Sequence, residues 1–496
     1  MSDNLPTTTT TTIRGGVRDT RALPVLGSSA PDAIALGRHL PTERKMRYGG
    51  DQHVLVFGPN GKGKGTRILM PNLLQMQGSS IVVVDPKGEL AAVTAPYRRT
   101  LGRVVILNPF AVLTNRRGYD DLESEGFNPL AALDPEADSF NSQAAALADA
   151  MVTVEGTDPH WTQSARALIA ALIMFEVIEA RKEDVAPTLA HVREMLCAPV
   201  QPPDDAKDLP GKGLPATARA MMESRHAGLR NKAAQFTDWT REVQSIASAA
   251  KIQTEPFDDP EIADDLARGT FDFGDLKREP TTVYLILPPD MMARHSKWLR
   301  LVLTAAIHGV MSPRGRGAPK VLFMLDEFFA LGHLEIISTV WALARGYGVQ
   351  MMPILQDLPQ LKKLYADMWE TFIGMAGAVA SFAPNDMTSA DWLSKRMGET
   401  TLPIMSYSEG SNTNERGETT TSANRSHSSV KVPMMLAHQL FGLPEGWMIV
   451  TLDGLSDAVI VEAKGYYRLR LLDALARPNP YHLGGAVAPR SYATLA

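Results

Sequence analysis

The chain has 496 residues, of which 44% are hydrophobic and 21% charged, and its formal net charge is −5. This length is too great for one compact core and predicts two to four domains, while the composition excludes a wholly disordered or collagen-like chain. The acidic balance excludes a surface covered in positive charge, so any nucleic-acid contact must be local. The single cysteine, Cys197, excludes an intrachain disulfide and a cysteine zinc cluster, and it fits a reducing compartment.

The first 45 residues contain neither a signal peptide nor an apolar core segment. The chain begins Met-Ser-Asp-Asn without a basic start and an apolar run, and six threonines occupy 7–12. We expect a partly disordered N-terminal arm over 1–45, because this segment offers little to bury. The longest apolar stretch, 165–180, carries Arg166 and Glu176 and is shorter than the about 20 residues of a membrane span, so no span is predicted.

Residues 46–137 alternate between short apolar strands and helical segments. Continuous apolar or β-branched runs predict buried strands at 53–57, 80–85 and 103–108, and a helix is expected at 67–76. Strands that alternate with helices favour an open parallel sheet of the α/β class.

A glycine-rich loop joins the first of these strands to the first helix. The pattern Gly-x4-Gly-Lys runs from Gly58 to Lys64, whereas Lys62 would need a glycine at Val56. In such a loop backbone N–H groups surround phosphate oxygens, and the lysine reaches the β- and γ-phosphates of a nucleotide. The residues expected to bind the nucleotide are Gly58, Pro59, Asn60, Gly61, Lys62, Gly63, Lys64, Gly65 and Thr66.

The residue after Lys64 departs from the usual pattern. A serine or threonine normally follows the lysine and holds Mg²⁺, but here Gly65 stands there and Thr66 comes one residue later. Either Thr66 or water fills that coordination position. The alternative is a glycine-rich turn that binds no ligand.

The composition changes after about residue 135. Between 138 and 268 there is almost no strand pattern, and alanine-rich segments predict helices, which are expected at 141–151, 162–182, 217–223 and 227–251. Trp161, Leu168, Leu172 and Phe175 recur at helical spacing, so we expect Trp161 to pack in a core. Residues 138–268 are therefore predicted to form an inserted all-α domain.

Strands return in the second part of the α/β domain, which we place at 269–480. They are expected at 281–287, 321–325, 349–355, 378–382, 447–452 and 458–461. Residues 404–431 are rich in Ser, Thr, Asn, Glu and Gly and predict a flexible loop or the tip of a long hairpin. Residues 481–496 are assigned to a C-terminal tail.

Two carboxylates end the apolar strand at 321–325. We expect Asp326 to hold Mg²⁺ and Glu327 to polarise the attacking water, because carboxylates that follow a buried strand do this in P-loop NTPases. Gln356 follows the next strand, at the sheet edge where ligands bind, and is a candidate sensor of the γ-phosphate. Arg345 ends a helical stretch at 337–345 and is a candidate arginine finger for a neighbouring subunit. An ordinary loop glutamine and a solvent-facing arginine are the alternatives.

The other basic clusters and the search for further catalytic motifs give less evidence about function. Arg98-Arg99 and Arg314-Gly315-Arg316 are candidates for phosphate contacts, but the preferred interpretation is solvated surface charge, as for most short charge runs. The histidines show no HExxH spacing, and no serine lies in a Gly-x-Ser-x-Gly turn.

Several motifs taken together resemble a known family. They are IVVVDPKGEL at 81–90, Asn-Pro-Phe at 108–110, MPNLL at 70–74, LDEF at 325–328, QDLPQL at 356–361 and the pair Lys64-Gly65. This combination resembles the TraG/TraD-like type IV coupling proteins, the ATPases of conjugation and type IV secretion. Segments 386–401 and 432–467 are also similar, and the resemblance extends over about 45–470.

The resemblance implies a RecA-like P-loop NTPase sheet interrupted by an all-α domain, and a ring-shaped homo-hexamer that uses ATP and Mg²⁺. Its implied partners are a relaxase–DNA complex or protein substrates, single- or double-stranded DNA, and inner-membrane components of a type IV secretion system. It assigns Lys64, Asp326, Glu327, Gln356 and Arg345 to their family roles, and it tolerates Gly65 after the lysine.

One departure changes the expected location. Members of the family usually start with two transmembrane helices, which this sequence does not show. We therefore expect a cytoplasmic protein that reaches the inner membrane through partners and is a monomer or loose oligomer in isolation. The alternatives to a motor are a nucleotide-binding cargo adaptor and an assembly scaffold; the intact Lys64, Asp326 and Glu327 favour the motor.

Overall fold

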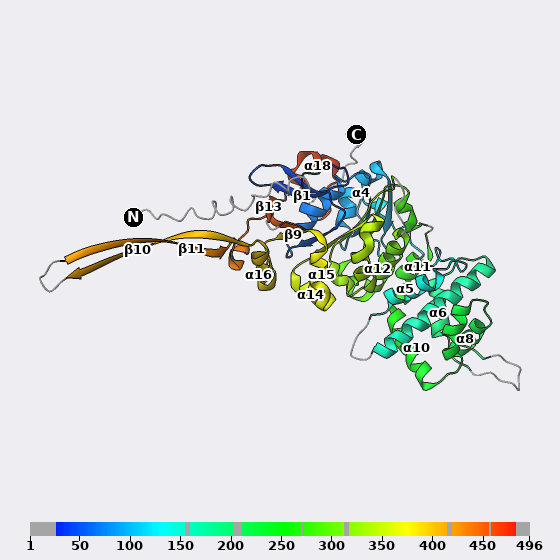
Figure 1. Ribbon diagram of the computed structural model, residues 1–496. Coiled ribbons are helices and arrows are strands. Elements are labelled where there is room, and N and C mark those ends of the chain that lie inside the picture. The colour runs from blue at the N-terminus through cyan, green and yellow to red at the C-terminus, as the bar shows by residue number, and fades with distance from the viewer. Residues whose placement is uncertain are drawn as a thin grey trace.

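The computed structural model describes residues 26–153, 159–201, 211–269, 271–311, 317–413, 419–455 and 458–482. The threonine run at 7–12, the basic cluster at 314–316 and most of the tail at 481–496 lie outside these ranges. Within them, eleven strands form one sheet in the order β2-β1-β13-β12-β9-β3-β8-β7-β4-β6-β5, and helices cover both of its faces (Figure 1).

The strands of this sheet lie close to the predicted positions, and two were not predicted. Their bounds are β1 Ile34–His39, β2 Lys45–Tyr48, β3 His53–Phe57, β4 Ser80–Val84, β5 Arg103–Leu107, β6 Thr281–Leu285, β7 Val321–Leu325, β8 Val349–Leu355, β9 Ala376–Phe382, β12 Trp447–Leu452 and β13 Val459–Glu462. From β9 to β5 neighbouring strands are parallel, whereas β12, β13, β1 and β2 are antiparallel.

The central strands are buried on both faces, which explains why their sequences are continuous apolar runs. Every residue of β3, β4, β7 and β8 is buried. Alternate side chains enter two separate cores: Leu55 of β3 packs in one and Val56 in the other. The predicted α/β class, with a parallel P-loop-type sheet and a helical insertion, is confirmed.

The helices of the α/β part flank this sheet. They are α3 Met70–Leu73, α4 Glu89–Leu101, α12 Pro289–Val310, α13 Glu335–Leu343, α14 Leu358–Tyr365, α15 Trp369–Gly374, α16 Met387–Arg396, α17 Ala437–Leu440 and α18 Arg470–Leu475. The helix expected at 67–76 is present, but its ends differ by two to three residues: it begins as a π-helical turn, η1 (Gly65–Leu69), continues as α3 and ends at Leu73. The stretch expected at 337–345 is α13 followed by the short helix η7 (Ala344–Tyr347).

All helices of the described insertion fall between 138 and 268. They are α5 Phe140–Met151, α6 Pro159–Glu183, α7 Leu189–Cys197, α8 Leu214–Met222, α9 Ala227–Ala233, α10 Arg241–Thr254 and α11 Pro260–Ala267, and they gather at one end of the molecule (Figure 1). Helix α6 packs against α5, α7, α9 and α10 and buries Leu168 and Leu172 completely. The prediction for Trp161 was wrong: its side chain is 36% exposed, because it lies in the first turn of α6, beyond this core.

Helix α6 is longer than the sequence indicated. Among the described residues it is the one helix, at His160–Glu183, whose length and apolar composition match a membrane span, and about half of that window (56%) is buried inside the protein. The same length and composition occur in a core helix, so the match alone is weak evidence of a span.

Two further expectations need correction. Residues 34–39 of the predicted N-terminal arm form β1, which pairs with β13 and buries Ile34 and Leu36. Arg98 is not a surface charge: it is 2% exposed and donates to Thr282 Oγ1 and Met76 O. Arg99 does lie near the surface, where it pairs with Asp121.

The region expected to be a flexible loop, 404–431, is a β-ribbon for most of its length. Strands β10 (Glu399–Thr413) and β11 (Thr419–Pro433) pair antiparallel from Glu399↔Pro433 to Thr413↔Thr419 and extend away from the sheet (Figure 1). The alternative interpretation, a long hairpin, is therefore the one that the structure adopts. Polar Ser and Thr side chains suit a ribbon with solvent on both faces.

His53, the first residue of β3, joins three elements. Its Nδ1 accepts a hydrogen bond from Met351 N (3.0 Å) and its Nε2 lies 3.0 Å from Trp341 O, so the proton must be on Nε2. The side chain is 2% exposed, and burial lowers the pKa of His53 to about 4. The folded protein therefore holds His53 neutral where the unfolded chain binds a proton.

We expect this histidine to weaken the fold in acid. Because its pKa is lower in the folded state, its contribution is complete above about pH 6.5 and is lost between pH 6.5 and 4, by about 3 kcal/mol in total. His53→Gln keeps a donor and an acceptor but does not titrate, so its free energy of unfolding should fall less than that of the parent over this range. Urea unfolding of both proteins at pH 7 and 4.5 measures the difference, and equal pH dependence would contradict the prediction.

Candidate functional site

The loop after β3 has the backbone shape that a phosphate loop requires. Gly61 and Gly63 have φ of 82° and 79°, which glycine adopts without strain. The Lys64 side chain turns back over the loop, where Nζ donates to Gly58 O (2.7 Å) and Pro59 O (3.4 Å). Lys64 is buried, and burial lowers its pKa, an effect that the carboxylates of Asp326 and Glu327 oppose. Lys62, the competing lysine, is only half-buried.

The helix that follows the loop begins as the π-helical turn η1. Turns of this kind are rare and often occur at functional sites. Thr66 lies in this turn and its hydroxyl donates to Gly63 O (3.3 Å), so it stays beside the loop. Arg67 is 7% exposed; it donates to Ala463 O (3.0 Å) and forms an ion pair with Glu445. Arg67 therefore connects the phosphate loop to the segment before β12 and the end of β13.

The two carboxylates lie where β7 ends. Glu327 has a left-handed backbone (φ 50°, ψ 42°), which is uncommon for a residue with a side chain and is one kind of strain that clusters at functional sites. Burial, together with the charge of Glu327, raises the pKa of Asp326 to about 6. Lys64 and Lys87 partly offset this shift, so both ammonium groups lie within electrostatic range of Asp326.

Strand order explains why these residues meet. Strands β3 and β7 both flank β8, and all three are parallel, so the loop at 58–66, the carboxylates and Gln356 share one edge of the sheet. Gln356 is half-buried, and its backbone N–H donates to Gln360 Oε1 (2.9 Å), which fixes the turn before α14.

The structure places two further charged residues at this edge of the sheet, to which the sequence analysis gave no role in the site. Asp85 follows β4, the other neighbour of β7, and its Oδ2 accepts from Ala91 N (2.8 Å). Burial raises the pKa of Asp85 to about 7, and the charges of Glu89 and Asp326 add to the shift. Lys87 is two residues further on. The position of both directly after a buried parallel strand was the signal that could have identified them.

Arg345 lies elsewhere. It belongs to η7, just before β8 begins at Val349, and is exposed, so it is at the opposite edge of the sheet from Lys64 and Glu327. Strand β8 has seven residues, which separates the two edges by about 20 Å. Arg345 therefore cannot reach the loop of its own chain.

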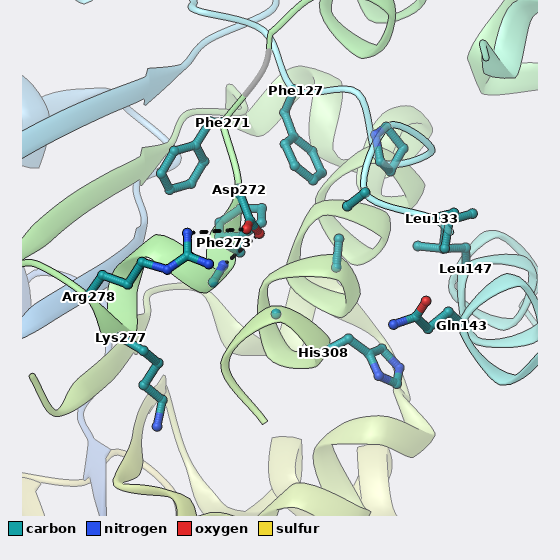
Figure 2. Close-up of a pocket in the computed structure, with 15 residues that line it drawn as sticks. Phe127, Leu133, Gln143, Leu147, Phe271, Asp272, Phe273, Lys277, Arg278 and His308 are labelled. Atoms are coloured by element: carbon teal, nitrogen blue, oxygen red, sulfur yellow. Dashed lines mark hydrogen bonds and ion pairs between the residues drawn. The ribbon is translucent and has the colours of Figure 1, made fainter. Parts of the chain in front are cut away.

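A cavity of about 430 Å³ also lies away from the phosphate loop. Figure 2 shows Phe127, Phe271 and Phe273 on one side of it and Gln143 and His308 on the other. The cavity lies between α5 of the all-α insertion and the α/β part of the molecule. No residue of the 58–66 loop lines it. This cavity and the loop at 58–66 thus lie at different places in the molecule.

The residues at the loop edge fit a nucleotide and a divalent cation. Lys64 is a buried ammonium group whose hydrogen bonds go to backbone carbonyls of its own loop, so an anion would supply the countercharge it lacks. Asp326 is a carboxyl beside a second carboxylate, and a cation would stabilise its charged form.

Comparisons with known proteins relate most of the chain to one family. The family model described as "Type IV secretory system Conjugative DNA transfer" matches residues 26–482. Conjugal transfer protein TraG of Escherichia coli is 27% identical over 381 residues, which cover 72% of this chain and 56% of that protein. TraG of Rhizobium radiobacter is 27% identical over 415 residues (82% and 60%), and VirD4 of the same organism is 28% identical over 375 (74% and 51%). The chain thus spans a little over half the length of these relatives.

Solved structures show the same fold. The coupling protein TrwBdeltaN70 in its unbound form matches with a TM-score of 0.63 and 15% identity over 90% of each chain. TrwB in complex with ADP and Mg²⁺ matches with a TM-score of 0.58 and 15% identity, over 84% of this chain and 86% of that one.

Proposed function

Because the chain belongs to the type IV secretory system conjugative DNA transfer family, we propose that it is the ATP-hydrolysing coupling protein of such a system. In this role it recruits a relaxase–DNA complex or protein substrates to the secretion channel and powers their transfer. The observation that carries the proposal is the convergence of Lys64 with Asp326 and Glu327 at one edge of a parallel sheet. An adaptor that only holds cargo would need no second carboxylate there.

Each residue at the loop edge then has a task. The backbone N–H groups of the residues that follow Pro59 in the loop, 60–66, and the Lys64 ammonium hold the β- and γ-phosphates. Asp326, with the Thr66 hydroxyl or water, would hold Mg²⁺, which neutralises phosphate charge when bound. Glu327 accepts a hydrogen bond from the attacking water and orients it, and the Gln356 amide contacts the γ-phosphate.

Arg345 supports an assembled active form. Since it is exposed and about 20 Å from its own phosphate loop, it serves a neighbouring copy, as an arginine finger does. A ring of subunits, six in the form the family resemblance implies, would place it there. The same proposal includes DNA and inner-membrane components of the secretion system as partners of the protein. Through these partners the protein is located at the inner membrane.

ATP hydrolysis measured with and without single-stranded DNA, beside mass determination at several protein concentrations, tests the function. We expect Mg²⁺-dependent hydrolysis that rises with DNA or concentration. If the protein bound nucleotide but did not hydrolyse it under any of these conditions, the cargo-adaptor function would be favoured over the motor function.

We expect Arg345→Ala to remove that rise. Arginine fingers raise the rate of hydrolysis about 10³-fold or more in other P-loop enzymes. The ATPase activity per subunit at high protein concentration should therefore drop to the level of the dilute protein, while nucleotide binding is retained. Arg241→Ala, an exposed arginine at the start of α10, is the matched control and should behave like the parent. A retained rise in Arg345→Ala would exclude the role in trans.

A further inference from the structure

A second cavity, of about 470 Å³, lies where the first and last strands of the sheet meet. Its walls come from β1, β2, the end of β13, the α3 region and α18. In Figure 1, α18 and β1 lie at the end of the molecule away from the all-α helices. No residue at 58–66, and none of Asp326, Glu327 or Gln356, lines it.

The charge of this cavity is opposite to that of the chain. Its lining holds six cationic side chains and one carboxylate, Glu462, although the whole protein has a net charge of −5. The cations are Arg38, Lys45, Arg47, Arg67, Lys464 and Arg470. Two of them are neutralised: Arg67 pairs with Glu445, and Lys464 with Glu462 (3.2 Å).

The other four keep their charge available. In the described part of the chain, Arg38, Lys45, Arg47 and Arg470 have no carboxylate within ion-pair distance, and Arg47 bonds only the amide oxygen of Gln75 (2.9 Å). Like charges held together on one rim repel one another, so this arrangement favours an anion.

The floor of the cavity is apolar. Met46 and Leu74 are 1% exposed and Leu472 is 7% exposed. At the rim, Leu471 of α18 is 76% exposed, and its neighbour Arg470 is exposed as well. An exposed leucine beside arginine and lysine is an arrangement that settles at a membrane–water interface.

We propose that this cavity binds an anionic phospholipid at a membrane surface. The headgroup phosphate lies among the four free cations, and the first part of an acyl chain lies over Met46, Leu74 and Leu472. Leu471 enters the interface beside it. Charge complementarity selects the anionic headgroup, and the apolar floor distinguishes a lipid from a free phosphate. The proposal does not depend on ATP hydrolysis.

Sedimentation of the full chain with vesicles tests the proposal. We expect binding to vesicles of equal phosphatidylglycerol and phosphatidylcholine, and none to phosphatidylcholine alone. Each basic residue near an anionic surface contributes about fivefold to partitioning, so Arg38→Ala, Lys45→Ala and Arg470→Ala together should weaken binding about 100-fold. These side chains make no hydrogen bond in the described part of the chain, so the variant should fold like the parent, which its thermal unfolding checks.

Two controls separate the sources of binding. Lys212→Ala, Arg225→Ala and Arg241→Ala change the net charge equally on exposed cations of the all-α part and should leave partitioning unchanged. Leu471→Ser should weaken vesicle binding severalfold, whereas glycerol phosphate at millimolar concentration should not compete. Equal binding by the parent and the Arg38/Lys45/Arg470 variant, or no binding to anionic vesicles, would overturn the proposal. Binding of an acidic peptide without vesicle binding would overturn it in favour of a protein partner.

Discussion

Lys64→Ala should reduce ATP hydrolysis by about 10²–10³-fold or more. The substitution removes the one ammonium group that is buried within the phosphate loop, where low solvent access makes its charge most effective. The fold should survive, because the side chain bonds only carbonyls of its own loop. Steady-state hydrolysis and thermal unfolding of the variant measure both effects.

Lys62→Ala provides the comparison for that result. Lys62 lies two residues earlier in the same loop and is half-buried, without the inward hydrogen bonds of Lys64. Its loss should reduce hydrolysis much less. Wild-type turnover in Lys64→Ala, or a greater defect in Lys62→Ala, would refute the assignment of the phosphate-binding lysine.

Glu327→Gln should retain ATP binding and lose about 10²–10⁴-fold in turnover. The amide occupies the same space and tolerates the same backbone, but it is a poor acceptor for the proton of the attacking water. Titration with a fluorescent ATP analogue and single-turnover hydrolysis separate binding from chemistry. We expect the nucleotide dissociation constant to change little.

Glu335→Gln serves as the matched change for that experiment. Glu335 begins α13, eight residues later, and is exposed, with His333 as its neighbour. It should hydrolyse ATP like the parent. If Glu327→Gln also did so, another group would have to orient the water, and Asp85 would be the next carboxyl at this edge to test.

The sequence predicted the parallel strands well, because strands buried on both faces leave continuous apolar runs. It did not predict β1 and β2. Strand β1 contains Gly37 and Arg38, and its pairing with β13 brings Gly37 so close that a Cβ there would lie 2.6 Å from Glu462 O. Such an edge depends on residues more than 400 positions away in the chain, which local composition does not reveal.

The site was predictable where the residues themselves carry the chemistry. Lys64, Asp326 and Glu327 follow from motif and position, and strand order then places them at one edge. Arg98 was misjudged because two adjacent arginines look like surface charge, whereas one of them lies under the sheet with backbone carbonyls as partners. The prediction for Trp161 was wrong for a related reason. Helical spacing shows which face of a helix is apolar, but it does not show over what length of the helix that face is covered by other elements.

The pairing of distant strands has a consequence for how the protein is made. Strand β3, which carries the proposed phosphate loop, lies between β8 and β9, and β1 pairs with β13, so these two early strands meet those partners only after residues of the last third of the chain have left the ribosome. The helices between 138 and 268 contact mostly one another and can fold first. Strand β4 can pair on both sides once residue 325 has emerged, β3 once residue 382 has emerged and β1 only after residue 462, and until then their apolar runs resemble those of aggregation-prone segments. We expect folding of the sheet to be slow and to benefit from chaperones that hold the amino-terminal third of the nascent chain.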